Sequence, residues 1–445
     1  MSEESLSIED VLGDWEQQGV QNVRFELPDM HGTSRSKLVP LTHAASYAED
    51  GLNMYGGTVV LDSNSDVVAN TLYNEEVAYA DQRLRPDPST AAVVPWAAAT
   101  GRMICDTEWD DGSPLGAAPR HVYRRALDRC RELGYEPLIG IELEFYLLDG
   151  ETREQLFSGY HIFNTVRNTY VPAIEQIVAQ MREYGIDIIT ANCEYAGSQW
   201  EINFTPGRGI EGPDRAFSFK NGTKEIAHQN GLLASFMSKP FSDSAGCGCH
   251  AHMGLLVLDG DENAMADAED EIGLSAVGRQ FVAGQLRHAR SVYALLSPTV
   301  NCFKRRRTHT FSPTNVSWGV EDRSAFVRVK GGGSLASKHI ENRAPTGMAN
   351  PYLVCAALLG AGVLGIEEEL ELEPAARPPA EEDESKEQLP TTVEESLELF
   401  ESDGKIVGLL GEEFARAYGV MRRHELERFA DHVTDWEREE YLELY

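Results

Sequence analysis

GIELEFYLL, residues 140–148, alternates apolar and acidic side chains. The odd-numbered positions from Ile141 to Leu147 are apolar, whereas Glu142 and Glu144 are acidic. Residues two apart in a β-strand lie on the same face, so the two carboxylates share one face and the apolar side chains share the other. The stretch therefore predicts a half-buried strand whose polar face is available for chemistry.

Four other segments carry charged or histidine side chains in related patterns. They are His250 and His252 in CHAHMGL, Glu341 and Arg343 in ENR, Arg323 and Arg328 on either side of an apolar strand in RSAFVRV, and Glu194 and Glu201 around Gly197 in ANCEYAGSQWEINF. Each segment alone is compatible with the wet face of an antiparallel sheet, because such sheets commonly have one solvated side. Considered together, the segments predict one shared polar site.

A site that gathers five carboxylates and a histidine requires cations, because the carboxylates would otherwise repel one another and stay partly protonated. Sites rich in carboxylate oxygen suit the hard divalent ions Mg²⁺ and Mn²⁺. Arginines beside such ions would bind anionic substrate groups through bidentate, charge-assisted hydrogen bonds. Metals together with arginines indicate phosphoryl transfer.

A series of motifs resembles, in order, that of the glutamine synthetase family. The motifs are IELEFYL, CEYAGSQWEINF, FMSKPF followed by AGCGCHAH, NCFKR, NVSWGVEDRSAFVRV, HIENRAP and ANPYLVCAAL. The resemblance implies an α+β fold with an N-terminal β-grasp domain in residues 1–110. Residues 111–445 would form a catalytic domain with a curved antiparallel sheet and flanking helices. The resemblance also implies double-ring oligomers, usually dodecamers, with active sites at subunit interfaces.

The resemblance also assigns a role to each candidate residue. The metal ligands would be Glu144, Glu194 and Glu201 at a tighter site, and Glu142, His250 and Glu341 at an ATP-linked site. The other matches are His252 near the nucleotide phosphates, Gly246 with its backbone on glutamate, Arg305 and Arg343 on the glutamate carboxylates, and Arg323 and Arg328 on the phosphates of ATP and of γ-glutamyl phosphate.

Phe311 departs from the pattern of family members that make glutamine, which carry a glutamate at this place in the flap after the NxxKR motif. That glutamate guards the intermediate and helps to form a negative ammonium pocket, so an aromatic residue removes a charge and a proton acceptor. Ala245 also departs, since glutamine makers usually have an asparagine there. Asp62, in VVLDSNSD, is similar to an aspartate that reaches the ammonium from a neighbouring subunit. One carboxylate with an aromatic wall suits an alkylammonium.

These departures resemble the branch of the family that ligates glutamate to organic amines, which implies an ATP-dependent ligase that joins the γ-carboxylate of glutamate to an organic amine through γ-glutamyl phosphate. Putrescine, longer polyamines and short alkylamines are the favoured acceptors, with two or three Mg²⁺ or Mn²⁺ ions at each site. Two alternatives stay open: a true glutamine synthetase that uses ammonium, and a non-catalytic relative that acts as a sensor. The full set of metal ligands favours the enzyme, because a relative that only binds has no chemical need for all six.

The composition is that of a large globular protein, with 445 residues of which 42 % are apolar. The formal net charge of −33 argues against nucleic acid or an anionic membrane as partner, since either requires basic surface. Only nine of the 39 basic residues are lysine, and acidic side chains crowd residues 257–271 and 367–387. A salt-loving cytoplasm is one hypothesis for this acidity.

The seven cysteines have no regular spacing, so we expect reduced thiols. The start MSEESLSIED lacks the basic and apolar regions of a secretion signal. Both observations predict a cytoplasmic protein. The run CGCHAH suggests zinc at first sight, but so short a segment cannot easily place four side chains around one tetrahedral ion.

Before Arg120 the sequence predicts a β-rich part, with strands such as Val23–Leu27 and Thr58–Leu61 and no long amphipathic helix. Beyond it, helical patterns alternate with short strands, as in an α+β domain. The expected helices are 119–133, 170–184, 214–230, 278–297, 350–369, 393–401 and 411–434. For the amphipathic segment at the C-terminal end, we favour packing on the core over a role in assembly.

Overall fold

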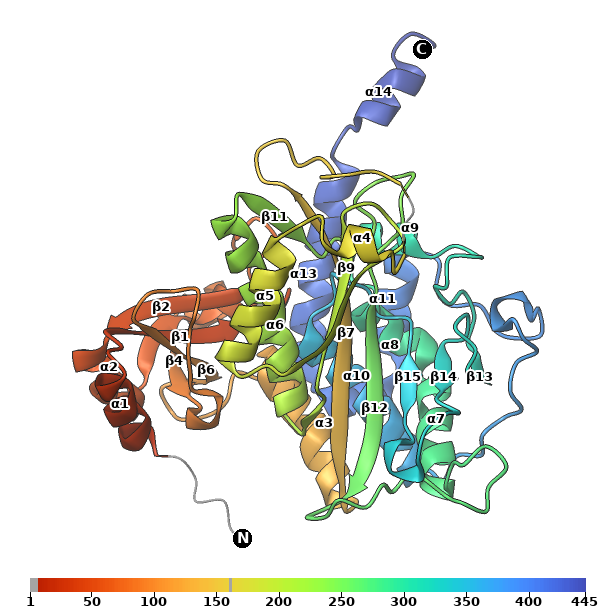
Figure 1. Cartoon of the computed structure of the whole chain (residues 1–445), viewed down its shortest axis with the longest axis horizontal. Helices are drawn as coiled ribbons and strands as arrows, with labels where there is room; N and C mark the ends of the chain where they lie inside the picture. Colours follow the sequence, from red (N-terminus) through yellow and green to blue (C-terminus); the bar gives the residue numbers. More distant parts are fainter. Residues whose placement is uncertain (1–6, 160–161) are drawn as a thin grey trace.

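Two β-sheets organise the computed structural model, which describes residues 7–159 and 162–445. A six-stranded sheet belongs to the N-terminal part, and a nine-stranded sheet forms the centre of the larger part. Figure 1 shows the small sheet, in red and orange, at one side of a body whose long strands β7 and β12 run side by side. The mixed α+β architecture agrees with the prediction.

The small sheet has the strand order β2-β1-β6-β4-β3, and β5 pairs with β6. Its strands are β1 (Asn22–Pro28), β2 (Ser34–Pro40), β3 (Leu52–Tyr55), β4 (Asp81–Pro86), β5 (Ala92–Val93) and β6 (Thr100–Glu108). Strand β1 is antiparallel to β2 and parallel to β6, so the first and last strands are neighbours at the centre. Val23, Phe25 and Leu27 are buried, as the period of two along β1 requires.

Two amphipathic helices, α1 (Ile8–Gln17) and α2 (Leu41–Asp50), belong to this part and correct the expectation of no such helix before Arg120. Helix α1 begins where the Ser7 hydroxyl accepts the N–H of Asp10, which satisfies one of the free donors at the helix start. Its Trp15 packs against Gly101 of β6, where an added Cβ would lie 2.7 Å from the indole. The glycine therefore leaves room for the helix to sit on the sheet.

The expected strand Thr58–Leu61 is wrong, because Gly56–Val60 forms the 3₁₀ helix η1. At Gly57 an added Cβ would lie 2.2 Å from Oδ1 of Asn74, so the chain can turn tightly here only without a side chain. Val59 and Val60 are fully buried. The apolar run reflects a buried turn, which periodicity alone does not distinguish from a strand.

The large sheet has the order β13-β14-β15-β12-β7-β9-β8, with β10 and β11 also paired to β7. All its pairs are antiparallel except β13 with β14. Its strands are β7 (Tyr135–Asp149), β8 (Ile188–Cys193), β9 (Gln199–Phe204), β10 (Gly207–Arg208), β11 (Leu232–Ser235), β12 (Cys249–Val257), β13 (Trp318–Val320), β14 (Val327–Val329) and β15 (Ile340–Asn342).

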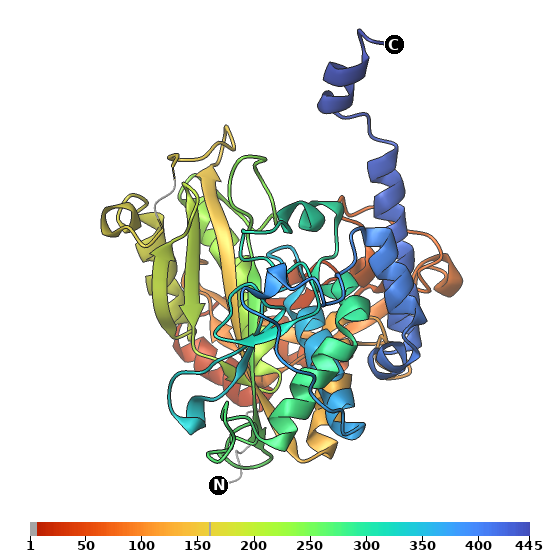
Figure 2. The ribbon, with the colours of Figure 1, turned by 90° about the vertical axis from the view of Figure 1, so that its right-hand side faces the viewer.

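Helices pack against the apolar face of this sheet, as Figure 2 shows from the side. Helix α10 (Pro351–Glu367) contacts both α3 (Pro119–Glu132) and α7 (Ala276–Arg287), and nearly all of its residues are buried. Gly284 of α7 faces Gly365 of α10, and a Cβ on either would lie 2.2 Å from a carbonyl oxygen of the other helix. The helical layer therefore leaves the opposite face of the sheet for polar side chains.

The remaining helices include the predicted ones and three short α-helices, at 165–168, 300–305 and 404–410, that lie outside the predicted ranges. They are α4 (Thr165–Asn168), α5 (Ala173–Tyr184), α6 (Glu211–Gln229), α8 (Ala289–Leu296), α9 (Val300–Arg305), α11 (Val393–Ser402), α12 (Gly404–Leu410), α13 (Glu412–Ala430), α14 (Asp435–Tyr441), and the 3₁₀ helices η2 (Glu75–Val77), η3 (Pro88–Thr90), η4 (Leu335–Ser337) and η5 (Ala380–Glu382). The predicted helix 278–297 is divided at His288, whose Nδ1 lies 2.6 Å from Oδ2 of Asp403. Helix α13 begins after Gly411, which has a φ of 107°, and ends at Ala430.

The C-terminal helix α14 projects from the body (Figures 1 and 2) and buries none of its residues. Trp436 and Leu442 are more than half exposed. The expectation that this segment packs on the core of its own chain is therefore wrong. Within the described residues, no helix has the length and apolar character needed to cross a bilayer.

Candidate active site

The register of the large sheet places the predicted polar residues directly opposite one another on neighbouring strands. Glu201 of β9 pairs with Glu144 of β7, and Glu142 of β7 pairs with His250 of β12. His252 of β12 then pairs with Glu341 of β15, which pairs with Arg328 of β14. Directly opposite residues lie on the same face of a sheet. One polar row therefore crosses five strands.

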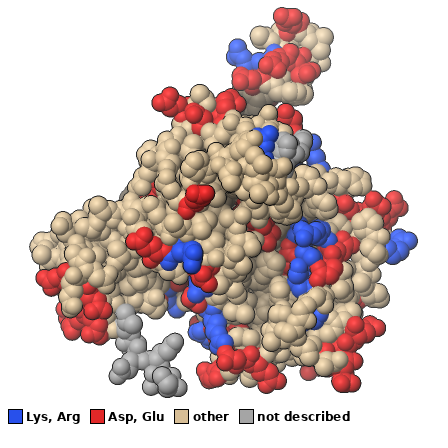
Figure 3. All heavy atoms as spheres, in the orientation of Figure 1, with Lys and Arg blue, Asp and Glu red and all other residues tan. Residues whose placement is uncertain are grey.

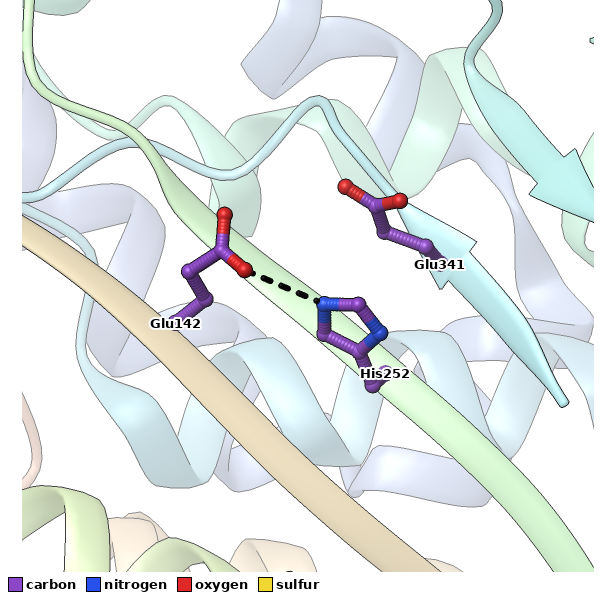
Figure 4. Close-up of side chains that lie close together, drawn as sticks. All are labelled: Glu142, His252 and Glu341. Carbon is purple, nitrogen blue, oxygen red and sulfur yellow. Dashed lines mark ion pairs between the residues drawn. The ribbon is translucent and has the colours of Figure 1, made fainter. Parts of the chain in front are cut away.

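The centre of this row holds a cluster of two carboxylates and two imidazoles. Nδ1 of His250 lies 2.7 Å from one oxygen of Glu142 and 3.7 Å from Glu341. Nε2 of His252 lies 3.5 Å from the other oxygen of Glu142 (Figure 4). One ligand atom each from Glu142, His252 and Glu341 lies within 4.8 Å of the others, a spacing that fits a single metal ion. The carboxylate oxygens suit a hard divalent cation.

Two arginines meet the buried carboxylate of Glu341. Nη1 of Arg328 donates to Oε2 of Glu341 at 2.9 Å, and Arg343 forms an ion pair with Oε1. Burial alone would raise the pKa of Glu341, but the charges of His250 and Arg343 outweigh it and lower the pKa to about 2. This carboxylate is therefore ionised at neutral pH and available as a ligand.

The other end of the row carries an excess of negative charge. Burial, reinforced by neighbouring carboxylates, raises the pKa of Glu201 to about 10 and the pKa of Glu194 to about 8. Glu144 accepts the backbone N–H of Gly248 at 2.8 Å and an N–H of Gln199 at 3.3 Å. Together with Glu144, these two residues form a carboxylate-rich site that a divalent cation would neutralise. The residues present thus fit the metal that the sequence predicted.

The loop before β12 and helix α9 form a tight wall beside the carboxylates. An added Cβ at Gly248 would lie 2.7 Å from the His250 ring and 2.9 Å from the guanidinium of Arg305. At Gly246 it would lie 2.7 Å from Ser238 O and from Cγ of Arg305. The backbone here is bare because side chains would fill the space in front of Arg305.

Phe311 lies in the flap after α9 and is exposed at 46 %. Its ring centroid lies 6.3 Å from that of Tyr195, which directly follows Glu194. The next flap residue, Ser312, accepts a hydrogen bond from Nη1 of Arg305 at 3.1 Å. The flap is therefore tied to the site on one side and meets an aromatic residue on the other.

A cavity of about 500 Å³ opens beside the cluster, between β7, β12 and the loop before β15. Glu142, His252 and His339 line its polar end, whereas Ile189 and Phe204 belong to its apolar wall. Nδ1 of His252 lies 3.2 Å from Nε2 of His339. The cavity can thus hold a ligand with an apolar ring and a charged end.

A family model for the catalytic domain of glutamine synthetase matches residues 116–441. The chain belongs to the glutamine synthetase family. It is 35 % identical over 434 residues to γ-glutamylethanolamide synthetase GlnA4 of Streptomyces coelicolor, with 94 % of this chain and 92 % of that protein covered. It is 32 % identical over 453 residues to a glutamine synthetase of Mycolicibacterium smegmatis, with 98 % of both covered.

The fold agrees with this assignment. A solved GmaS/ADP complex matches with a TM-score of 0.86 at 28 % identity, and the match covers 98 % of this chain and 99 % of that one. Glutamine synthetase family members are ligases that form carbon–nitrogen bonds between glutamate and ammonia or an amine, with ATP and divalent metal ions. The predicted enzyme class is confirmed, and the branch of the family that ligates organic amines is among the relatives.

Two residues predicted from the family pattern lie apart from the cluster. Arg323 is exposed, and its carbonyl oxygen accepts the Nε–H of Arg343 at 2.8 Å. Asp62 is fully buried, where it accepts the N–H groups of Asn64 and Asp66 and pairs with Arg428 of α13. Within its own chain, Asp62 therefore organises a loop.

Zinc binding by CGCHAH does not fit the geometry. Cys247 and Cys249 are fully buried, and Cys249 lies on the opposite face of β12 from His250 and His252. Burial raises the pKa of both thiols, which keeps them protonated and poor ligands.

The sequence analysis did not single out several residues that lie at the candidate site. Gln199 shares the polar face of β9 with Glu201 and donates to Glu144. Its spacing of two residues from Glu201 could have placed it on this face from the sequence alone. Glu321 pairs with Arg328 and accepts the N–H of Gly331 at 2.7 Å. Tyr195 and His339 gave no pattern of their own, because each lies in a loop and is placed by tertiary contacts.

Proposed function

We propose that this protein joins the γ-carboxylate of glutamate to a small organic amine at the expense of ATP, through γ-glutamyl phosphate. Putrescine, a longer polyamine or a short alkylamine is the acceptor class. The observation that carries the proposal is Phe311, an aromatic side chain that lies in the flap over the site and meets Tyr195. A carboxylate at this place would attract ammonium, whereas aromatic rings favour an alkylated cation.

The nucleotide would occupy the cavity beside β12, with its base against the apolar wall and its phosphates toward His252, Arg323 and Arg328. Glu142, His250 and Glu341 would hold one Mg²⁺ or Mn²⁺ ion, and Glu144, Glu194 and Glu201 would hold one or two more. When bound, these ions would draw the phosphates and the carboxylate together and absorb negative charge as it develops. The spacing of Glu142, His252 and Glu341 supports such a site.

Glutamate would lie between Gly246, Arg305 and Arg343, whose guanidinium groups bind carboxylates in bidentate fashion. An oxygen of its γ-carboxylate attacks the γ-phosphorus of ATP, and ADP departs. The nitrogen of the amine, as the free base, then attacks the acyl carbon. The carbon–oxygen bond to phosphate breaks, and the departing phosphate takes the proton that the nitrogen loses. Arg328, which donates to Glu341, would stabilise charge on the transferred phosphoryl group.

Ammonium is the second candidate acceptor, because a glutamine synthetase is among the relatives at 32 % identity. In that case the site would have to hold ammonium without a flap carboxylate.

We further propose a division into an N-terminal β-grasp domain (1–110) and a catalytic domain (111–445), supported by the parallel pairing of β1 with β6 in the small sheet. Family members typically assemble, and we propose a double-ring dodecamer. The projecting helix α14, with Trp436 and Leu442 exposed, supports self-association, since apolar surface of this kind commonly marks a contact between subunits. Truncation after Asp431 should lower the assembled mass in light scattering.

The acidic surface supports a high-salt cytoplasm as the setting. Acidic groups gather at several places in Figure 3, and the net charge is −33. All seven cysteines are buried, in keeping with a reducing compartment. Activity that rises between low and molar potassium chloride is the expected result, and activity that does not rise would contradict it.

The decisive experiment measures ATP-dependent phosphate release with glutamate and Mg²⁺ or Mn²⁺, with products identified by mass. Ammonium is compared with putrescine, spermidine, ethanolamine and methylamine. Faster turnover with an organic amine supports the proposal. Faster turnover with ammonium would make the protein a glutamine synthetase.

A further inference from the structure

Tyr195 and Phe311 belong to two loops that are far apart in the sequence but meet at the edge of the site. Tyr195 follows β8 directly after Glu194, and Phe311 lies in the flap after α9. Their ring centroids are 6.3 Å apart with the planes inclined at 43°. Offset aromatic pairs at this separation attract each other. The two rings therefore form one aromatic surface.

This surface is fixed to the groups that would bind metal and glutamate. The N–H of Tyr195 donates to the carboxylate of Glu194 at 3.2 Å. On the other side, Ser312 accepts from Arg305 at 3.1 Å. Each ring is thus adjacent in sequence to a residue that contacts the polar site. An amine that reacts at this site would therefore have its carbon chain close to the rings.

The rings are exposed at 42 % for Tyr195 and 46 % for Phe311. The backbone of Phe311 has a φ of 55°, and that of His309 has a φ of 62°, in the left-handed region that side chains rarely adopt. Such conformations persist where the surrounding structure holds them, commonly at binding sites. An exposed aromatic pair held by an unfavourable backbone is better explained by a ligand than by core packing.

The charge of the flap limits what that ligand can be. Residues 299–320 include Lys304, Arg305, Arg306 and Arg307 but no aspartate or glutamate. Glu381, which reaches the flap, already accepts the N–H of His309 at 2.9 Å and lies 3.7 Å from its imidazole. On the Phe311 side, a second ammonium group on an acceptor would therefore meet the positive charge of Arg305, whose Nη1 lies 3.1 Å from the hydroxyl of Ser312, whereas an uncharged carbon chain or hydroxyl would not.

We infer that Tyr195 and Phe311 together contact the carbon chain of the acceptor, and that the acceptor is a monoamine with a short, uncharged tail, rather than a diamine or polyamine. This inference rests on the proposed amine ligase function and narrows its substrate class. Tyr195 is the specificity residue that it adds to the site.

The test uses the full-length wild-type enzyme with propylamine, ethanolamine, putrescine and ammonium, and the variants Tyr195→Ala and Tyr195→Phe. We expect the wild type to use the monoamines with a higher kcat/KM than putrescine. Tyr195→Ala should raise the KM for propylamine about tenfold, the size of one lost aromatic contact, while the KM values for glutamate and ATP stay within about twofold. Tyr195→Phe keeps the ring and should restore the wild-type KM.

The remaining outcomes separate the two ideas. A wild type that prefers putrescine would overturn the monoamine inference and leave the amine ligase intact. Use of monoamines with an unchanged KM in Tyr195→Ala would overturn the role of Tyr195 alone. A wild type that accepts only ammonium would overturn both. Thermal unfolding of each variant with and without ADP distinguishes a loss of contact from a loss of folding.

Discussion

Glu144 and Glu201 lie directly opposite each other on β7 and β9, so two carboxylates share one cross-strand position. Like charges at such a position destabilise a sheet. The neighbouring Glu142 and Glu194 reinforce the effect, since burial and these charges raise the pKa of Glu201 to about 10. The strand pair is therefore suited to bind a cation. Without the cation, repulsion between the carboxylates makes the sheet less stable.

Glu201→Gln removes one of these charges and should have opposite effects on stability and activity. We expect the metal-free variant to unfold at the wild-type temperature or above it, because the repulsion is relieved. Mn²⁺ should stabilise the wild type more than the variant, which keeps the second proposed site of Glu142, His250 and Glu341, and turnover should fall by about 100-fold or more, as for lost metal ligands. Thermal unfolding with and without Mn²⁺ measures the first effect, and phosphate release measures the second. Glu175→Gln, an exposed change on α5, is the control. Full turnover in Glu201→Gln would refute the metal assignment.

Phe311→Glu restores a carboxylate to the flap and should shift acceptor preference toward ammonium. The negative charge attracts ammonium and removes the apolar contact for an alkyl chain, so the ratio of kcat/KM for ammonium to that for an alkylamine should rise about tenfold or more. Phe429→Glu introduces the same charge at a similarly exposed aromatic on α13 and controls for the added charge. An unchanged ratio would mean that the flap does not select the acceptor.

Asp62→Ala should destabilise the protein by about 2 kcal/mol, because it leaves the N–H groups of Asn64 and Asp66 without their acceptor. The change also leaves Arg428 without its partner in the chain. Chemical denaturation measures the loss. Asp66→Ala, which removes an exposed carboxylate from the same loop, is expected to cost less than about 0.5 kcal/mol. Equal losses in the two variants would contradict the structural role of Asp62.

Asp403 links α8 to α12 and should contribute stability that depends on pH. Burial would raise its pKa, but hydrogen bonds from His288 and Ser291 outweigh burial and lower the pKa to about 2. A carboxyl group with a depressed pKa stabilises the fold above its unfolded pKa of about 4, and this contribution is lost as the pH falls from there toward about 2. Asp403→Asn should therefore lose stability at pH 6 but show a weaker further decrease in that window. Denaturation curves at pH 6, 4 and 3 provide the measurement. A parallel pH dependence in the two proteins would exclude the effect.

Much of the site could be predicted from strand periodicity. The spacing of Glu142 with Glu144, and of His250 with His252, is enough to place each pair on one face of a strand, and the structure has both strands. What periodicity cannot supply is the register between strands, which depends on packing across the whole sheet. The pairing of His252 with Glu341 could be learned only from the fold.

The errors have physical causes in tertiary structure. Thr58–Leu61 has the apolar content of a strand, but paired glycines before it let the chain turn into a buried 3₁₀ helix. Tyr195 could not be identified from the sequence pattern, because its contact with Phe311 depends on how two loops fold together.

Except for Glu194, the carboxylates and histidines of the proposed metal sites lie on paired strands, whereas Phe311 and Tyr195 lie in loops. Hydrogen bonding between strands restricts what can change in the first set without loss of chemistry, while loop residues are free to vary. Selection could thus exchange one amine for another by a few loop substitutions and leave phosphoryl transfer untouched. This separation of strand residues from loop residues would let gene duplication produce enzymes for many nitrogen sources from one fold.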